Sequence, residues 1–227
     1  KNLASEIPEW DFNEVRQASS DTWNQALGQI AVKGNNEKEM VKFYSALYNA
    51  HFLPRTFSDV DGSYPRFDGD GQIMKMDHGS YYCDFSQWDT YRAVHPLFSI
   101  LNPSRNGDMA HSLVLKGQQG GWLPIFPSWN SYTAAMIGDH CIAMIGDAIV
   151  KDTPGFDYEE AYTLMRKNAF EANPDSGSYR DGKGRRAMES YLKYNYVPLE
   201  DQVTEAFHRR EPVSYTHLRA HETRGNL

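Results

Sequence analysis

The segment from residue 138 to residue 150, GDHCIAMIGDAIV, is apolar on almost every side of the helix that it would form. A helix of this kind is buried in a protein core, whereas a surface helix carries a single apolar stripe. Most other periodic segments of the chain have only one such stripe. The combination predicts a helical fold in two layers, an inner ring of buried helices and an outer ring that covers it.

Helical periodicity and capping residues extend over most of the chain. Asp11 and Glu14 have the spacing of a capping box, and a second pair of this kind opens the segment at residue 157. Pro96 interrupts one helical segment, so that helix either begins near His95 or bends there. With no alternating strand pattern, the fold class is mainly α. We expect about eight helices, over residues 11–30, 37–52, 89–101, 106–118, 138–150, 157–170, 184–194 and 199–210.

Residues 54–88 contain no convincing helix and carry two clusters of glycine and acidic residues, with a short strand pair expected around residues 72–76. A stretch of this length without helix in a helical protein is more often functional or disordered than a simple connection. Asp59 and Asp61 have the spacing that opens an EF-hand loop, but Tyr64 stands where that loop requires glycine. We therefore expect these two acids to form a turn, with a ligand or domain contact as the alternative.

Composition argues against several classes of function. The formal net charge is −7 and Lys and Arg form no cluster, which argues against a nucleic-acid partner. No apolar run approaches the length of about 18 residues that a membrane span needs. The two cysteines, Cys83 and Cys141, form no CxxC pair, so a thiolate metal cluster is excluded, while a disulfide between them stays open.

Six ordered segments, separated by similar gaps, resemble glycoside hydrolase family 92. They are SEIPEWDFNEVR, FYSALYNAHFLPRTFSDVDGSY, DFSQWDTYRAVHPL, GGWLPIFPSWNSYTAAMIGDH, DAIVKDTPGFDYEEAY and YLKYNYVP. This resemblance implies a calcium-dependent, inverting exo-α-mannosidase, mostly bacterial, that removes terminal mannose from mannose-rich glycans. It implies a secreted, periplasmic or cell-surface location.

In that family a β-sandwich domain precedes an (α/α)6 toroid, and the pocket lies where the two meet. The resemblance implies that residues 1–10 end the interdomain linker and that residues 11–212 form the first half of the toroid. The β-sandwich and the second half would then be partners outside this chain. The family's catalytic acid, base and main calcium ligands lie in later motifs that this sequence does not contain, so no catalytic or metal-binding residue is assigned here.

Asp89 and Trp88 are the foremost candidates for substrate contact. An acid beside a tryptophan at a helix start can accept hydrogen bonds from sugar hydroxyls while the indole face packs against the ring. The alternative from the residues alone is that Asp89 only caps its helix; the resemblance favours the site role. Arg92, one turn later, either positions the carboxylate or reaches the ligand.

Asp139 and His140, at the start of the buried helix, are the second pair of substrate-binding candidates. His140 and Asp147 are seven residues apart and therefore project from nearly the same side of a helix. That side faces either the pocket or the core, where His140 would be a satisfied core histidine. Trp122 either lines a subsite or closes the end of the helical array.

Residues 213–223, VSYTHLRAHET, resemble the translation of a sequencing-library adapter. We therefore expect residues 213–227 to be a non-native tail that packs on nothing. Two further functions remain open: a fragment of another inverting (α/α)6 exo-glycosidase of the trehalase or glucosidase kind, and a non-catalytic, sugar-binding half-domain.

Overall fold

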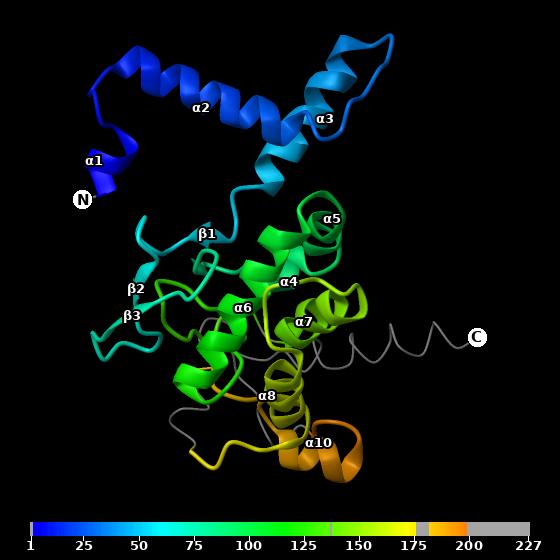
Figure 1. Cartoon of the computed structure of the whole chain (residues 1–227). Helices are drawn as coiled ribbons and strands as arrows, with labels where there is room; N and C mark the ends of the chain where they lie inside the picture. The colour runs from blue at the N-terminus through cyan, green and yellow to red at the C-terminus, as the bar shows by residue number, and fades with distance from the viewer. Residues whose placement is uncertain (1, 137, 176–181, 199–227) are drawn as a thin grey trace.

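The computed structural model describes residues 2–136, 138–175 and 182–198. These residues are mainly helical, and helices α2 and α3 extend from one side of a body that contains the other long helices and two small sheets (Figure 1). The helices are α1 Asn2–Glu6, α2 Phe12–Leu27, α3 Glu37–Ala50, α4 Gln87–Thr90, α5 Val94–Leu101, α6 Pro103–Gly120, α7 His140–Val150, α8 Tyr158–Phe170 and α10 Met188–Tyr194. The strands are β1 Arg55–Thr56, β2 Ser63–Pro65, β3 Ile73–Lys75 and β4 Tyr82–Cys83.

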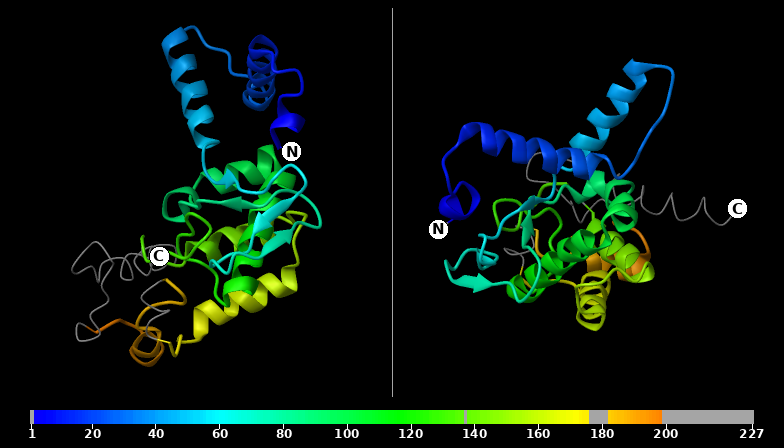
Figure 2. Two further views of the ribbon diagram at one scale, coloured as in Figure 1. Left: turned by 90° about the vertical axis from the view of Figure 1, so that its left-hand side faces the viewer. Right: turned by 45° about the horizontal axis from the view of Figure 1, so that its top comes forward.

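Helices α2 and α3 form a pair that stands apart from the body (Figure 2). Asp11 caps α2 by accepting hydrogen bonds from the first backbone N–H groups, as its capping-box spacing predicts. Between the two helices, the ring of Trp23 packs edge-on against Tyr48 with 4.4 Å between centroids. Leu47 is the only buried residue of this described pair. Of the apolar residues that recur along residues 11–30, Phe12 and Val15 are exposed, and the others, Trp23, Leu27 and Ile30, are half-buried.

The core forms where α6 passes α5, α7 and α8. Asn102 and Pro103 start α6 as N-cap and first helical residue, and Gly121 ends it in the left-handed conformation at φ 87°. The buried apolar cluster consists of Tyr82, Phe85, Phe98, Met109, Leu113, Val114, Leu123, Cys141, Met144, Ile145, Ala161 and Leu164. Cys83 and Cys141 are both buried free thiols.

Two antiparallel ribbons occupy most of the stretch between α3 and α4. Strand β1 pairs with β4, and β2 pairs with β3. Strand β3 lies at the expected position, around residues 72–76, but its partner β2 lies earlier in the chain, at residues 63–65. The β1–β4 pair was not anticipated, because each strand is only two residues long. Asp61 accepts a hydrogen bond from the Ser63 backbone N–H, and Gly62 has φ 81°. The expected turn at Asp59 and Asp61 is therefore confirmed.

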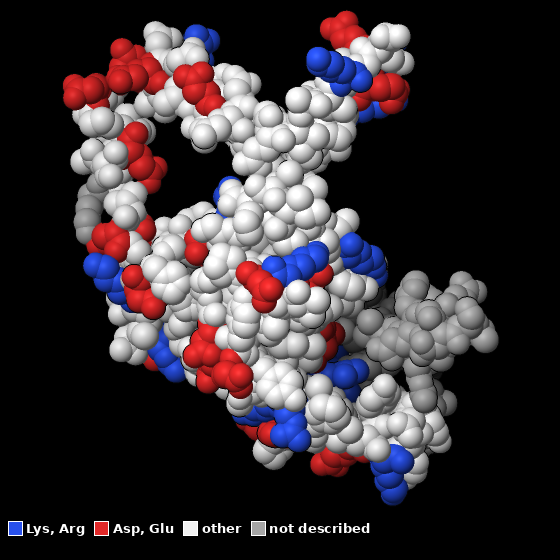
Figure 3. Space-filling model, turned by 45° about the vertical axis from the view of Figure 1, so that its right-hand side comes forward, with Lys and Arg blue, Asp and Glu red and all other residues white. Residues whose placement is uncertain are grey.

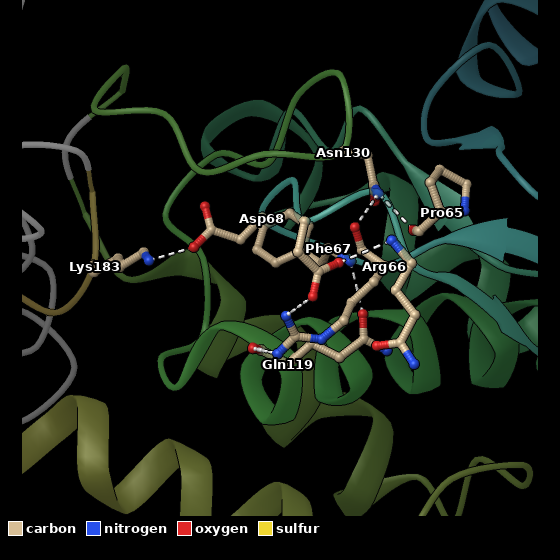
Figure 4. Close-up of polar contacts among 9 residues, drawn as sticks. Pro65, Arg66, Phe67, Asp68, Gln119, Asn130 and Lys183 are labelled. Carbon is tan, nitrogen blue, oxygen red and sulfur yellow. Dashed lines mark hydrogen bonds and ion pairs between the residues drawn. The ribbon is translucent and has the colours of Figure 1, made fainter.

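Polar contacts hold the segment after β2 to three other parts of the chain (Figure 4). Gln119 near the end of α6 accepts a hydrogen bond from the Phe67 backbone N–H at 2.8 Å. Asn130 donates to the Pro65 carbonyl at 2.7 Å, and Lys183 pairs with Asp68. These contacts fix loops that have few ladder hydrogen bonds of their own.

The mainly helical class is confirmed, with corrections to individual helices. The segment predicted at 89–101 is two helices, because the chain leaves α4 at Thr90 and α5 begins at Val94, two residues before Pro96. The segment predicted at 106–118 starts earlier, at Pro103. Residues 2–6 form a short helix within the predicted linker. The predicted helix at 199–210 and the predicted tail at 213–227 lie outside the described residues.

Helix α7 is buried on one side rather than all round. Its buried residues are His140, Cys141, Met144, Ile145 and Ala148. Val150, by contrast, is 85% exposed. Ala143 is exposed as well, whereas Ile142 and Ile149 are half-buried against the core cluster.

Charged side chains are dispersed over the surface. On the face that Figure 3 shows, Lys and Arg side chains lie scattered among acidic ones. No helix in the described part of the chain is long and apolar enough to cross a membrane.

Gly107 provides a test of the packing of α6. A Cβ at this position would lie 1.8 Å from the Pro154 carbonyl oxygen, a backbone atom that cannot move aside cheaply. We expect Gly107→Ala to lower the free energy of unfolding by about 2 kcal/mol or more in urea denaturation. The matched control is Gly146→Ala on α7, where the new Cβ meets only the Met165 methyl at 3.5 Å. That variant should gain up to about 1 kcal/mol from helix propensity; equal effects of the two substitutions would contradict the close contact.

Candidate functional site

The chain leaves β4 at Cys83 and runs into α4 through a tightly fixed residue, Asp84. Asp84 is buried, has φ 59°, and forms an ion pair with Arg55. Its other carboxylate oxygen accepts a hydrogen bond from the Trp129 backbone N–H at 2.8 Å. Because both carboxylate oxygens are engaged, Asp84 fixes the direction in which the chain enters α4.

Helix α4 exposes Trp88 and Asp89 to solvent. Ser86 is the N-cap, and its hydroxyl donates a hydrogen bond to the Asp89 carboxylate at 2.5 Å. The alternative that Asp89 itself caps the helix is therefore wrong, because Asp89 is the third helical residue. Trp88 is 41% exposed. Gln87, between Ser86 and Trp88, is fully buried.

A series of stacked groups joins α4 to the start of α7. The Arg92 guanidinium donates a hydrogen bond to the Trp88 carbonyl and lies 5.1 Å from the Trp88 ring centroid. The same guanidinium lies 4.6 Å from the Tyr91 ring centroid. Tyr91 stacks on His140, with 4.6 Å between centroids and 14° between planes. The structure thus brings Trp88, Arg92 and His140 together around Tyr91, with Asp89 on the same short helix.

Asp139 is next to His140 but has different surroundings. Both of its carboxylate oxygens are buried, and no described residue gives either of them a hydrogen bond of normal geometry. Burial raises the pKa of Asp139 to about 6, although nearby Arg185 and Asn168 act in the opposite direction. Asp139 therefore lies behind the exposed residues, on the side of α8.

Other residues singled out in the sequence have structural surroundings. Asp147 forms an ion pair with Lys151 at 2.7 Å. Trp122 is buried and packs with Phe67 and Tyr132, which fits the closing role rather than a subsite. His95 is buried beside Asn106, and burial lowers its pKa to about 4, so it is neutral at physiological pH.

Sequence reasoning missed two parts of this region. Arg55 and Asp84 pair across 29 residues, and no local pattern marks such a contact. Trp129 was not singled out, although it is 80% exposed with φ 50° in the loop whose backbone Asp84 binds. The Pro/Trp composition of that loop was the one available signal.

The one group of metal-ligating side chains found in the described part of the chain is not of the calcium type. Among the described residues, one group of three or more metal-ligating side chains is close enough to hold an ion: Asp77, His78 and His111. Two of its three ligands are imidazoles, whereas calcium requires six to eight oxygen ligands. This group therefore does not match the calcium site that the family resemblance implies.

Asp139 gives a prediction about pH. Because its pKa is higher in the folded than in the unfolded state, the folded protein holds this proton more tightly, and the stability contributed by Asp139 falls as pH rises from about 4 to about 6. We expect the wild type to lose about 2 kcal/mol relative to Asp139→Asn between pH 4.5 and pH 7.5. Urea denaturation at both pH values measures this. Glu159→Gln, an exposed carboxylate on α8, is the control and should show no such difference. A pH-independent gap between wild type and Asp139→Asn would refute the raised pKa.

The sequence-family model of the glycosyl hydrolase family 92 catalytic domain matches residues 1–218. The match extends past residue 213, where the adapter-like segment begins. No curated protein matches the chain. A family 92 α-mannosidase from Bacteroides thetaiotaomicron is 32% identical, with a TM-score of 0.76 over 88% of this chain and 25% of that one. An inverting family 92 mannosidase from the same species is 28% identical, with a TM-score of 0.77 over 87% of this chain and 26% of that one.

A third solved structure, a family 92 glycosyl hydrolase, is 22% identical, with a TM-score of 0.61 over 79% of this chain and 24% of that one, and shows likeness of fold alone. The chain spans about a quarter of the length of these structures. Since the family match covers nearly the whole sequence, this chain belongs to glycosyl hydrolase family 92 and lies within its catalytic domain.

Proposed function

We propose that this chain is part of an inverting exo-α-mannosidase that hydrolyses terminal α-mannosides of mannose-rich glycans. The observation that carries this proposal is the 32% identity to a solved family 92 α-mannosidase over 88% of this chain. That α-mannosidase has also been solved in complex with mannoimidazole. A secreted, periplasmic or cell-surface location in a bacterium is part of the same proposal.

Trp88 and Asp89 are the residues proposed to contact the sugar directly. The Asp89 carboxylate is exposed and oriented by the Ser86 hydroxyl, so it can accept hydrogen bonds from two adjacent sugar hydroxyls. The exposed indole of Trp88 offers an apolar face for the C–H side of a pyranose. Together they would orient a terminal sugar at the edge of α4.

Arg92, His140 and Asp139 are proposed to support this contact from behind. The Arg92 guanidinium is held by the Trp88 carbonyl and by two aromatic faces, so it stiffens the indole that receives the sugar. His140 supports Tyr91 by stacking. Asp139 is the N-cap residue of α7, directly before His140, and would act through His140 because its own oxygens are buried.

Hydrolysis would require groups beyond this chain. An inverting glycosidase needs a carboxylic acid and a carboxylate base about 6.5–9.5 Å apart, on either side of the scissile bond. The resemblance puts both of them, and the calcium ligands, in later motifs of the catalytic domain. A calcium ion there would polarise and grip the mannose diol. By itself the chain would then be a weak sugar-binding unit, which the quarter-length coverage of its solved relatives favours.

The activity prediction separates the chain from the longer protein. Residues 1–212 should release no aryl alcohol from an aryl α-mannoside, whereas the completed catalytic protein should do so, and a calcium chelator should abolish that turnover. An aryl α-glucoside serves as the control substrate and should not be hydrolysed. Chelator-sensitive turnover by residues 1–212 alone would mean that the catalytic groups lie within this chain.

Two substitutions in the completed protein test the proposed sugar contacts. Asp89→Asn keeps the shape of the side chain but removes a charged acceptor, and should lower kcat/KM on an aryl α-mannoside by about 10- to 100-fold. Trp88→Ala should raise KM more than it lowers kcat, because stacking acts on bound substrate and transition state alike. Glu159→Gln is the matched control and should leave both constants unchanged. Unchanged kcat and KM in both Asp89→Asn and Trp88→Ala would show that α4 does not contact the substrate.

A further inference from the structure

Two histidines and an aspartate from distant parts of the sequence meet at the surface, beside α6. Asp77 and His78 lie in the loop between β3 and β4, and His111 lies in α6. One ligand atom from each lies within 4.8 Å of the others. The two imidazole rings are nearly parallel, with 4.8 Å between centroids and 16° between planes. Neither the sequence motifs nor the proposed sugar site accounts for this group.

The hydrogen bond on the outer side of His78 determines which nitrogen faces the cluster. Its Nε2 lies 3.0 Å from the Gly155 carbonyl oxygen. Since a carbonyl can only accept, Nε2 must carry a hydrogen, and in the neutral ring Nδ1 then has a lone pair. Metal-binding histidines are commonly oriented in this way, with the second ring N–H donated to a backbone carbonyl.

That lone pair faces a carboxylate. The Nδ1 of His78 lies 2.9 Å from Oδ1 of Asp77. Two electron-rich atoms at this distance repel each other unless a proton or a metal ion lies between or beside them. The third member, His111, has a buried Nδ1 without a hydrogen-bond partner among the described residues. This nitrogen is therefore available as a metal ligand. A single cation could satisfy all three groups, whereas one proton on His78 would leave His111 unsatisfied.

The surrounding structure brings the loop close enough to α6 for one ion to reach both. Asp108, one turn before His111, accepts a hydrogen bond from the Ser80 backbone N–H at 3.1 Å. Gly79 has φ 63°, and a Cβ there would lie 2.1 Å from the Asp108 carboxylate, so a larger residue would strain the backbone and displace that side chain. The Asp108 carboxylate also adds negative charge next to the group without being one of its three members.

We propose that Asp77, His78 and His111 bind a divalent transition-metal ion of the zinc class. Two imidazole nitrogens and one carboxylate oxygen suit zinc, nickel or copper, and they do not suit calcium or magnesium. Side chains that are 76% exposed at Asp77 and 50% exposed at His78 leave access from solvent, so water would complete the coordination. The bound ion would tie the β3–β4 loop to α6. In the completed enzyme, zinc would therefore stabilise the protein through a site that calcium does not fill.

The experiment uses the full 227-residue chain and measures Zn²⁺ binding by isothermal titration calorimetry after treatment with a chelator. One ion should bind per chain, Ca²⁺ should not compete, and Zn²⁺ should raise the Tm as a ligand of the folded state does. Co²⁺ in place of Zn²⁺ should give visible absorption bands of a site with mixed nitrogen and oxygen ligands. Absence of binding, or displacement of the ion by Ca²⁺, would overturn the proposal.

Substitutions identify the ligands. His111→Ala and Asp77→Asn should each weaken Zn²⁺ binding at least tenfold. Because Asp77 is exposed, its substitution leaves the fold intact even where His111→Ala does not. The chain has eight histidines, and His217 and His221 lie near its C-terminus. The matched control is the double substitution His217→Asn and His221→Asn, which should leave Zn²⁺ binding unchanged. Loss of binding in that control alone, or equal affinity in Asp77→Asn and wild type, would contradict the assigned ligands.

Discussion

The side chain of Lys116 is fully buried beside β4, the strand that leads into α4. It donates a hydrogen bond to the Tyr82 carbonyl at 2.6 Å and lies 3.6 Å from the Tyr81 ring centroid. Loss of solvent lowers the pKa of Lys116 to about 7. Burying this amine costs free energy that the carbonyl and the aromatic faces offset. The contact joins α6 to β4 just before the segment that contains Asp84 and Ser86 and leads into α4.

The same principle holds the loops around α4. Strands of two or three residues provide few backbone hydrogen bonds, so side chains from distant segments fix these loops instead. Arg55 binds Asp84, and Asn130 donates a hydrogen bond to the Pro65 carbonyl at the end of β2. Each of these contacts joins a loop to a partner at least 29 residues away. Trp88 and Asp89 therefore stand on a scaffold that is fixed by long-range polar contacts rather than by a regular sheet, as a site that must hold its geometry requires.

The local part of this architecture could be predicted from the sequence. Capping residues and apolar periodicity locate α2, α7 and α8, since both signals act within one or two helical turns. Loops that enter the inner helices of an (α/α)6 toroid gather at one end, and the proximity of Trp88, Arg92 and His140 agrees with that arrangement. The Lys116 contact could not be predicted: a lysine on an amphipathic helix is normally solvated, and no local signal distinguishes the buried one. The one-sided burial of α7 could not be predicted for a related reason. An apolar sequence indicates that a helix can be buried, but it does not indicate which of its sides contact other helices.

Two carboxylates near α4 illustrate how the environment assigns different roles to the same chemical group. Asp89 is exposed and receives a hydroxyl hydrogen bond, so its carboxylate is accessible to accept hydrogen bonds from a ligand. Asp139 is buried with a raised pKa, so near neutral pH it exists in both protonation states. A raised pKa often marks a catalytic acid, but such an acid must also reach the substrate. Because both Asp139 oxygens lie below the surface, Asp139 does not meet this second condition.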